Sequence, residues 1–326
     1  MLNEIVLKNI VKRGNDIDYE LSIGDKDCTL RYRFEIVDET IDFNKIEERF
    51  DPIVVTLIYH ALKYGYDFRS DYPISNELLY QLTYQFVPQM LRCAPAGSLH
   101  SVEINAPLKE VEPVENWFGI NVSCDIDSMA AYYHYTRLIE NLASRVTHIV
   151  YLNTGAVTQS FLQATVDNVK HFRDRARQPL IIIDSNVADV IEDAFGDSDY
   201  SLSHTFRNCG AVTILQNYFR RFYYPTAINI DEFNVDVDRD CSYYDRWFLQ
   251  FISSRRLKFF LADCRAATRF EKLKLLSTYN YSYDTLHVCK QSDKNCGHCD
   301  DCLWTLKMLE ELDVLKRYKW VFDITE

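Results

Sequence analysis

The chain has 326 residues, of which 47% are hydrophobic and 26% charged, so it can bury a full core and accommodate two domains. Its formal net charge of −12 argues against a broad grip on nucleic acid, because each phosphate contact needs a lysine or an arginine. No apolar run reaches the length of a membrane span, and the N-terminus lacks a signal-peptide pattern. The sequence therefore predicts a cytoplasmic protein with a small-molecule, peptide or protein partner, and it leaves a homodimer open.

Residues 1–112 are expected to form a small α+β domain. Turn signals and alternating apolar residues predict strands at 5–10, 19–23, 29–37 and 99–104, and helices at 52–64 and 76–91. This part contains no catalytic motif, and binding of a protein partner is one role it could serve. The run 107–115, rich in proline and glutamate, is the expected boundary of the domain.

Residues 113–326 alternate short apolar runs with helical patterns. The expected strands are 117–122, 148–152, 180–183 and 222–227, and the expected helices are 128–144, 160–176, 188–194 and 206–219. This order predicts an α/β domain with a Rossmann-like parallel sheet covered by helices on both faces. Ligands bind such sheets beyond the carboxyl ends of the strands, which makes Asn153, Thr154 and Asp184 candidate ligand contacts.

A polar loop joins the first of these strands to its helix. Loop amides and a helix N-terminus together attract anions, so the loop is a candidate phosphate site. The alternative is a ligand-free turn in which Asp127 or Ser128 caps the helix. A low-pKa nucleophile at the helix N-terminus, Cys124, is a further alternative. The loop residues are Ser123, Cys124, Asp125, Ile126, Asp127 and Ser128.

Four of the ten cysteines lie within fourteen residues near the C-terminus. Their pattern is Cys289-x6-Cys296-Gly-His-Cys299-x2-Cys302, and tight turns of this kind bring four soft donors together for Zn²⁺. An iron–sulfur cluster or a redox-active cysteine pair is the alternative. A metal held at 289–302 would anchor the helix expected at 303–312 to the sheet.

The chain from about 117 to 326 resembles the PP-loop ATP pyrophosphatases, most closely the 7-cyano-7-deazaguanine synthase branch. That family has a Ser-Gly-Gly-x-Asp-Ser loop after its first strand and a C-x(6–8)-C-G-x-C-x2-C zinc motif near its C-terminus. Residues 123–128 match the two serines and the aspartate, and 289–302 match the zinc motif. Residues 151–155, 206–208 and 268–272 resemble further family segments around the nucleotide pocket. The loop departs from the pattern at both glycines, which are Cys124 and Asp125 here.

The resemblance implies a PP-loop enzyme that binds ATP, Mg²⁺ and Zn²⁺. Such an enzyme cleaves ATP to AMP and pyrophosphate and activates a carboxylate or amide of a small or peptidyl substrate for attack by a nitrogen nucleophile. By the same resemblance, the catalytic residues would be Asp127, Arg207 and Lys272. Nucleotide contacts would come from the whole 123–128 loop together with Asn153, Thr154, Asp184 and Asn208.

Two other classes of function compete with this interpretation. A catalytically degenerate PP-loop scaffold, stabilised by zinc, would act as a protein-interaction module through its N-terminal domain. A tRNA-modifying enzyme would also be compatible with the resemblance, but the acidic net charge disfavours it. Affinity for ATP separates the first competitor from the enzyme, and retention of tRNA at moderate salt would identify the second.

Overall fold

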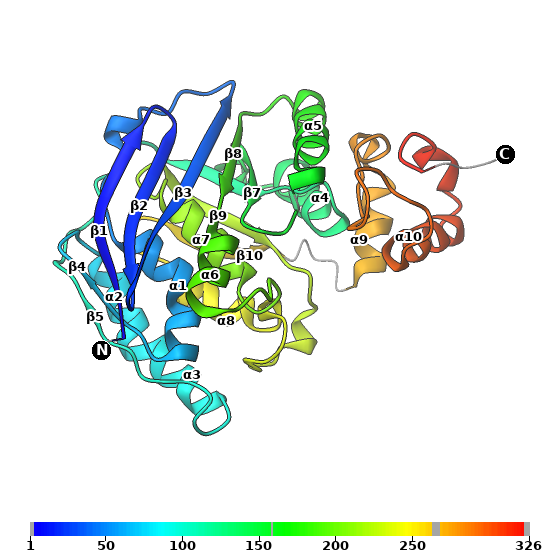
Figure 1. Cartoon of the computed structure of the whole chain (residues 1–326). Helices are drawn as coiled ribbons and strands as arrows, with labels where there is room; N and C mark the ends of the chain where they lie inside the picture. Colours follow the sequence, from blue (N-terminus) through cyan, green and yellow to red (C-terminus); the bar gives the residue numbers. More distant parts are fainter. Residues whose placement is uncertain (1–2, 158, 263–267, 323–326) are drawn as a thin grey trace.

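The computed structural model describes residues 3–157, 159–262 and 268–322 (Figure 1). Within them, ten strands form one mostly parallel sheet in the order β10-β9-β6-β7-β8-β3-β2-β1-β4-β5. The central five strands all run parallel: β6 (Trp117–Asn121), β7 (His148–Asn153), β8 (Leu180–Ser185), β9 (Phe219–Pro225) and β10 (Lys258–Ala262). Their order, β8-β7-β6-β9-β10, places later strands on both sides of β6, and doubly wound sheets bind ligands beyond the carboxyl ends of the strands at such a switch point.

The N-terminal strands extend this sheet rather than form one of their own. The strands β1 (Glu4–Arg13), β2 (Asp16–Ile23) and β3 (Lys26–Val37) are antiparallel, and β3 pairs with β8 over residues 32–37 and 180–185. Beyond β1 lie two short edge strands, β4 (Asp67–Ser70) and β5 (Ile104–Asn105). The strand expected at 99–104 is thus reduced to its last residue and the one after it. The boundary at residue 112 stays a prediction.

Helices cover both faces of the sheet, as the unbroken apolar strands predict (Figure 1). In β7, Ile149 and Tyr151 face one core while Val150 and Leu152 face the other. The first core is covered by α4 (Ile126–Tyr133), α5 (Gln159–Ala176), α9 (Arg269–Leu276) and α10 (Asp300–Glu311). The second is covered by α1 (Asp51–Tyr64), α2 (Asn76–Gln81), α3 (Val87–Cys93), α6 (Val187–Phe195), α7 (His204–Thr213) and α8 (Asp245–Phe251).

Two helices on the second face cross closely because one of them carries a glycine. A β-carbon on Gly210 of α7 would lie 3.0 Å from the Pro52 carbonyl oxygen of α1 and closer still to the Thr56 hydroxyl. The helix α1 begins with proline in its first turn and ends at Gly65 with φ of 72°, a left-handed conformation that glycine adopts readily. The contact between α1 and α7 ties the first third of the chain to the parallel sheet.

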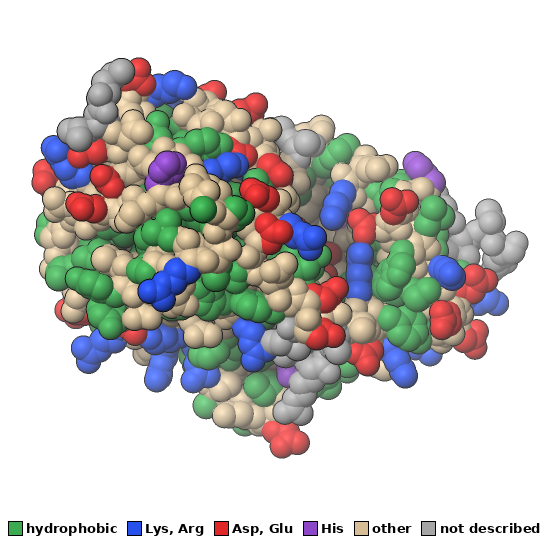
Figure 2. All heavy atoms as spheres, turned by 90° about the horizontal axis from the view of Figure 1, so that it is seen from below, with side chains coloured by type: hydrophobic (Ala, Val, Ile, Leu, Met, Phe, Trp, Pro, Cys, Tyr) green, Lys and Arg blue, Asp and Glu red, His purple; other side chains and the backbone are tan. Residues whose placement is uncertain are grey.

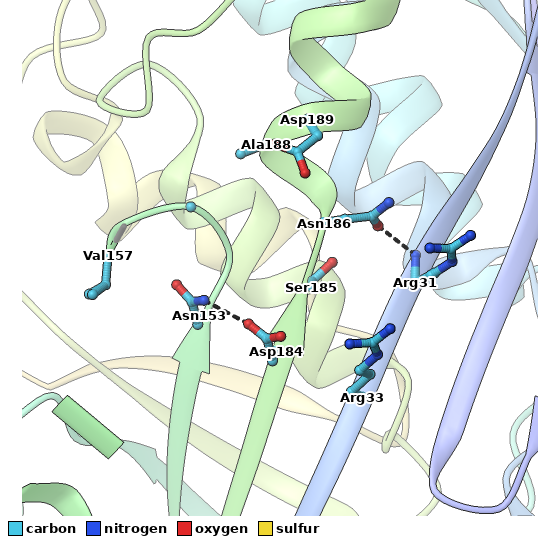
Figure 3. Close-up of a pocket in the computed structure, with 10 residues that line it drawn as sticks. Arg31, Arg33, Asn153, Val157, Asp184, Ser185, Asn186, Ala188 and Asp189 are labelled. Carbon is cyan, nitrogen blue, oxygen red and sulfur yellow. Dashed lines mark hydrogen bonds between the residues drawn. The ribbon is translucent and has the colours of Figure 1, made fainter. Parts of the chain in front are cut away.

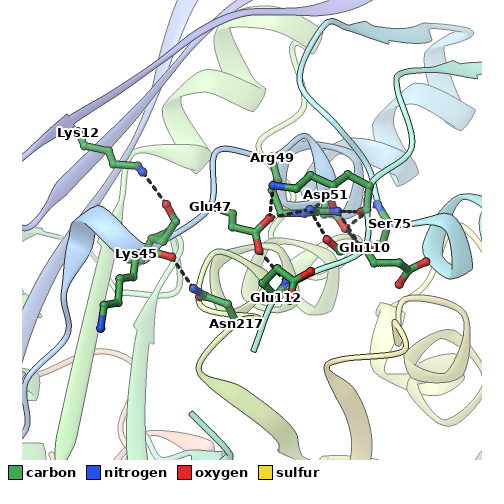
Figure 4. A network of polar contacts seen from close by, with 11 residues as sticks. Lys12, Lys45, Glu47, Arg49, Asp51, Ser75, Glu110, Glu112 and Asn217 are labelled. Atoms are coloured by element: carbon green, nitrogen blue, oxygen red, sulfur yellow. Dashed lines mark hydrogen bonds and ion pairs between the residues drawn. The ribbon is translucent and has the colours of Figure 1, made fainter. Parts of the chain in front are cut away.

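Hydrogen bonds hold the proline- and glutamate-rich run 107–115 against the residues just before α1 (Figure 4). Arg49 has only 2% of its surface exposed and donates to the carbonyl oxygens of Lys109 and Glu110. The same guanidinium contacts the Asp51 carboxylate at 3.1 Å, and Asp51 in turn accepts hydrogen bonds from Ser75. The expected domain boundary therefore coincides with an ordered segment fixed by a buried ionic network.

Several expected helices have different bounds in the structure. The helix expected at 128–144 is α4 followed by one π-helical turn over 134–138, and the helix expected at 206–219 ends at Thr213 because Phe219 pairs with Trp117 in the sheet. The helix expected at 76–91 contains a π-helical turn over 82–86, because Pro88 lacks the N–H that a regular α-helix needs there. The sequence reading missed β4, β10 and α8.

Candidate active site

The loop between β6 and α4 makes a sharp turn at the position where the PP-loop family has its first glycine. Cys124 has φ of 65°, a left-handed conformation that costs a non-glycine residue about 1–2 kcal/mol. Its side chain is fully buried in the core, and burial raises the pKa of the thiol, with the Asp125 charge adding to the rise. The thiol therefore lacks the lowered pKa that a nucleophile at this position would need, so that alternative for Cys124 is wrong.

The polar groups of the loop bond mainly to one another. The Ser123 amide and hydroxyl each donate to the Ser128 hydroxyl at 3.2 Å. The Ser128 amide, at the N-terminus of α4, donates to the Asp125 carboxylate at 2.8 Å. Asp125 is thus the N-cap of α4, in place of the expected Asp127 or Ser128. The Ile126 side chain lies in the core, so only its backbone can face a ligand.

Asp127 and Lys272 form an ion pair that joins the first turn of α4 to α9. The Lys272 ammonium donates to Asp127 at 2.6 Å and to the carbonyl oxygen of Thr226, just after β9, also at 2.6 Å. Burial raises the pKa of the Asp127 carboxyl and the Asp125 charge raises it further, while Lys272 offsets part of the rise. The capping box of α9 at Thr268 fixes the helix that carries Lys272. The structure therefore brings two of the three predicted catalytic residues together.

The remaining predicted nucleotide contacts form a second group at the carboxyl ends of β7 and β8. Asn153 and Asp184 are directly opposite each other in the two strands, and the Asn153 amide donates to Asp184 at 2.6 Å. Thr154 donates to Asn208 at 2.6 Å, and both side chains are buried. Among the described residues, no hydrogen bond joins this group to the 123–128 loop.

Arg207, the third predicted catalytic residue, lies beneath the second group. Its guanidinium donates to the Ser203 hydroxyl at 2.8 Å and lies 5.3 Å from the centre of the Tyr200 ring. Only 1% of its surface is exposed, and burial lowers its pKa. A β-carbon on Gly155 would lie 3.3 Å from this guanidinium and 2.7 Å from the Ala188 β-carbon. Arg207 therefore supports the backbone of the 154–156 turn from behind, apart from the pair of Asp127 and Lys272.

Four buried polar atoms at this edge of the sheet have no hydrogen-bond partner among the described residues. They are the Asn121 and Asn153 side-chain oxygens, the Tyr151 hydroxyl and one terminal nitrogen of Arg207. Burying such a group without a partner costs about 1–3 kcal/mol, so folded proteins rarely leave several close together. Asn121 pairs in register with Val150 and so faces the α7 side of the sheet, whereas Tyr151 faces the α5 side.

A pocket of about 320 Å³ opens next to Asn153 (Figure 3). One wall is formed by Asn153 and Gly155 after β7, a second by Asp184 and the start of α6, and a third by side chains of β3. The sequence reading missed the third wall. Arg31 and Arg33 come from the N-terminal part of the chain, and only the pairing of β3 with β8 brings them here. The sequence contained one signal for this wall: Arg31 and Arg33 are two residues apart on an expected strand, which places both side chains on the same face of the sheet.

The structure also brings together His204, Asp240 and Cys241, which the sequence reading did not connect. Their donor atoms lie within 4.8 Å of one another. His204 contacts Asp240 at 2.9 Å, and the same carboxylate oxygen accepts the amide and hydroxyl of Ser242. This oxygen is therefore already satisfied as the N-cap of the 241–244 turn.

The four predicted metal ligands are brought together as expected. All four sulfur atoms lie within 4.8 Å of one another, and the pairs Cys296–Cys302 and Cys289–Cys299 are each 3.9 Å apart. Sulfur atoms about 2.3 Å from a tetrahedral zinc ion lie about 3.8 Å apart, so the thiols could hold an ion such as zinc with little movement. The turn between them passes through Gly297 with φ of 75°.

The cysteine segment contacts the loop after β6. The His287 amide, two residues before the first cysteine, donates to the Cys124 carbonyl oxygen at 2.8 Å. The Asn295 side chain stabilises the segment, because its oxygen accepts a hydrogen bond from the Val288 amide and its NH2 group donates to the Leu286 carbonyl oxygen. Residues 268–322, which we call the C-terminal lobe, thus reach the candidate site through both Lys272 and His287 (Figure 1).

The face of the molecule seen in Figure 2 carries both acidic and basic side chains, with several basic ones along its lower left edge. None of the helices in the described residues is long and apolar enough to cross a membrane.

Comparisons of the chain with protein families, with curated proteins and with solved structures find no match.

Proposed function

We propose that the protein is an ATP-dependent adenylating enzyme of the PP-loop type. The observation that carries the proposal is the backbone of the 123–128 loop. Cys124 has a left-handed conformation where the family has glycine. The Ser123 and Ser128 hydroxyls contact each other, and the loop leads into α4 beside the strand at which the sheet order changes direction. These features favour a phosphate site even though neither glycine is present.

The overall reaction converts a carboxylate, an amine and ATP into an amide, AMP and pyrophosphate. ATP, when bound, would supply the adenylyl group that turns the carboxylate oxygen into a leaving group. The Ser123 and Ser128 hydroxyls would hold phosphate oxygens, and Asp127 would hold Mg²⁺. Lys272 would stabilise negative charge that develops during the transfer.

The Asp125 carboxylate must first leave the helix N-terminus, because it accepts the hydrogen bond from the Ser128 amide that a phosphate would need. We therefore expect Asp125→Gly, which restores the family's residue, to bind ATP with Mg²⁺ at least about tenfold more tightly than the wild type. Isothermal titration with ATP, ADP and AMP in the presence of Mg²⁺ measures this. The matched control is Asp42→Gly, which removes a similar capping carboxylate at the 43–45 turn. It should leave the affinity unchanged.

Catalysis is tested by release of pyrophosphate from ATP in the presence of candidate carboxylates. We expect Asp127→Ala to abolish the release while the Asp42→Gly control retains it. Failure of both the wild type and Asp125→Gly to bind any of the three nucleotides would overturn the proposal.

The second candidate is a catalytically degenerate scaffold that binds a protein partner through its N-terminal part. The observation that favours it is the set of hydrogen bonds by which the 123–128 loop satisfies its own polar groups. This candidate predicts that neither the wild type nor Asp125→Gly binds ATP. It also predicts a complex with the partner that survives Ser123→Ala and Ser128→Ala.

A further inference from the structure

The pocket in Figure 3 combines charges of both signs on facing walls. Arg33, Asp184 and Asn153 lie in register across three adjacent strands, so they form one polar row on one face of the sheet. Arg31, two residues before Arg33, shares that face and also lines the pocket. On the opposite wall, Asp189 in the first turn of α6 faces the same space.

One polar atom of the row still needs a partner. Asn153 is 97% buried, since only 3% of its surface is exposed, and its amide group donates to Asp184. Its side-chain oxygen has no hydrogen-bond partner among the described residues. Figure 3 shows this oxygen on the side away from Asp184, beneath the turn that leads to Val157. This oxygen is shielded from solvent, so it lies behind the wall of the pocket and not on its surface.

Arg31 and Arg33 lie on one side of the pocket and Asp189 on the other, so a ligand with a single charge would be repelled from one side. A ligand with a carboxylate at one end and an ammonium at the other would be complementary to both. The volume of about 320 Å³ is at the small end of the range for ligand pockets, which limits the ligand to a small molecule.

We propose that this pocket binds a free amino acid. Its carboxylate contacts Arg33 and Arg31, and its ammonium contacts Asp189. The arginines lie on the N-terminal strand β3, so the role of the N-terminal part of the chain is to complete the substrate site. Binding itself is independent of ATP.

The role of the amino acid as the nitrogen nucleophile rests on the proposed adenylation. In that step the nitrogen forms a bond to the activated carbonyl carbon as the bond from that carbon to the AMP oxygen breaks. The ammonium must first give one proton to solvent to expose the lone pair, AMP leaves with the electron pair of the broken bond, and the nitrogen then gives a second proton to solvent.

Titration of the full chain with each standard protein amino acid, in the absence of nucleotide, tests the binding. We expect at least one to bind, and its methyl ester and its N-acetyl derivative to bind about tenfold more weakly or worse, because each lacks one of the two charges. Equal binding of either derivative would overturn the zwitterionic ligand. Absence of binding by every amino acid at millimolar concentration would overturn the site.

Two variants locate the binding in the pocket. Arg33→Ala and Asp189→Asn, on facing walls, should each weaken binding about tenfold or more. The control for the first is Arg69→Ala on β4, because the side chains of Arg33 and Arg69 are 62% and 61% exposed and each has one long-range ionic contact. The control for the second is Glu192→Gln, an exposed residue on the same helix.

Both controls should bind like the wild type. A control that loses as much affinity as its partner variant would also overturn the site. If the protein binds an amino acid but binds no ATP, the proposed function is refuted and the amino-acid site is not.

Discussion

Replacing Lys272 with methionine tests the ion pair at the centre of the candidate site. Lys272 is 3% exposed and makes two contacts of 2.6 Å, to Asp127 and to the Thr226 carbonyl oxygen. Removing one partner of a buried pair leaves the other charge uncompensated, which costs about 3–5 kcal/mol. Methionine fills much of the same volume, so the loss should come from the charge and the hydrogen bonds rather than from a cavity.

The cost should depend on pH in a defined direction. The pKa of Asp127 is already raised by burial, and loss of Lys272 removes a group that lowers it. A raised carboxyl pKa means that the folded state holds its proton more tightly than the unfolded chain does. The variant should therefore lose stability as pH rises above the ordinary carboxyl value of about 4, and be less affected in acid.

Urea unfolding at pH 5 and pH 8 measures the free energy of unfolding of the wild type, Lys272→Met, Asp127→Asn and the double variant. The double variant should be more stable than Lys272→Met, because no buried charge remains. The matched control is Lys258→Met on β10, whose ammonium contacts Glu77 at 2.9 Å with both side chains more than a third exposed. It should change stability by less than about 1 kcal/mol. If Lys272→Met costs no more than this control, the ion pair is not the stabilising contact described here.

Three further predictions concern other parts of the fold. Burial raises the pKa of Asp245 to about 7, so the wild type should lose stability as pH rises from about 4 to about 7. Asp245→Asn should remove this loss. In urea unfolding at pH 8, the variant should therefore be more stable than the wild type by up to about 4 kcal/mol. Gly210→Ala should destabilise by at least about 1–3 kcal/mol, measured by thermal unfolding, because the new β-carbon meets Thr56 and Pro52 of α1. Cys302→Ala should lower the metal content measured by elemental analysis and make the C-terminal lobe more sensitive to limited proteolysis; an unchanged metal content would contradict the four-thiol site.

The sequence alone was sufficient for features that depend on neighbouring residues. The four cysteines at 289–302 are close in the chain, so tight turns bring their sulfur atoms together whatever the rest of the fold does. The apolar runs of β6, β7 and β8 are short and unbroken, which predicts strands buried on both faces. The candidate ligand edge followed from the same pattern, because parallel strands end at a common edge.

Only the tertiary structure decided which of these residues meet. Lys272 reaches Asp127 across 145 positions of sequence, and Arg33 meets Asp184 only because β3 joins the parallel sheet through β8. No local pattern specifies such a pairing, since the register of β3 follows from how its buried face packs against distant helices. The cap of α4 was also decided by the tertiary structure, because the sequence pointed to Asp127 or Ser128 and the structure uses Asp125. The closed loop geometry selects the cap, since the Ser128 amide would otherwise be left without a partner.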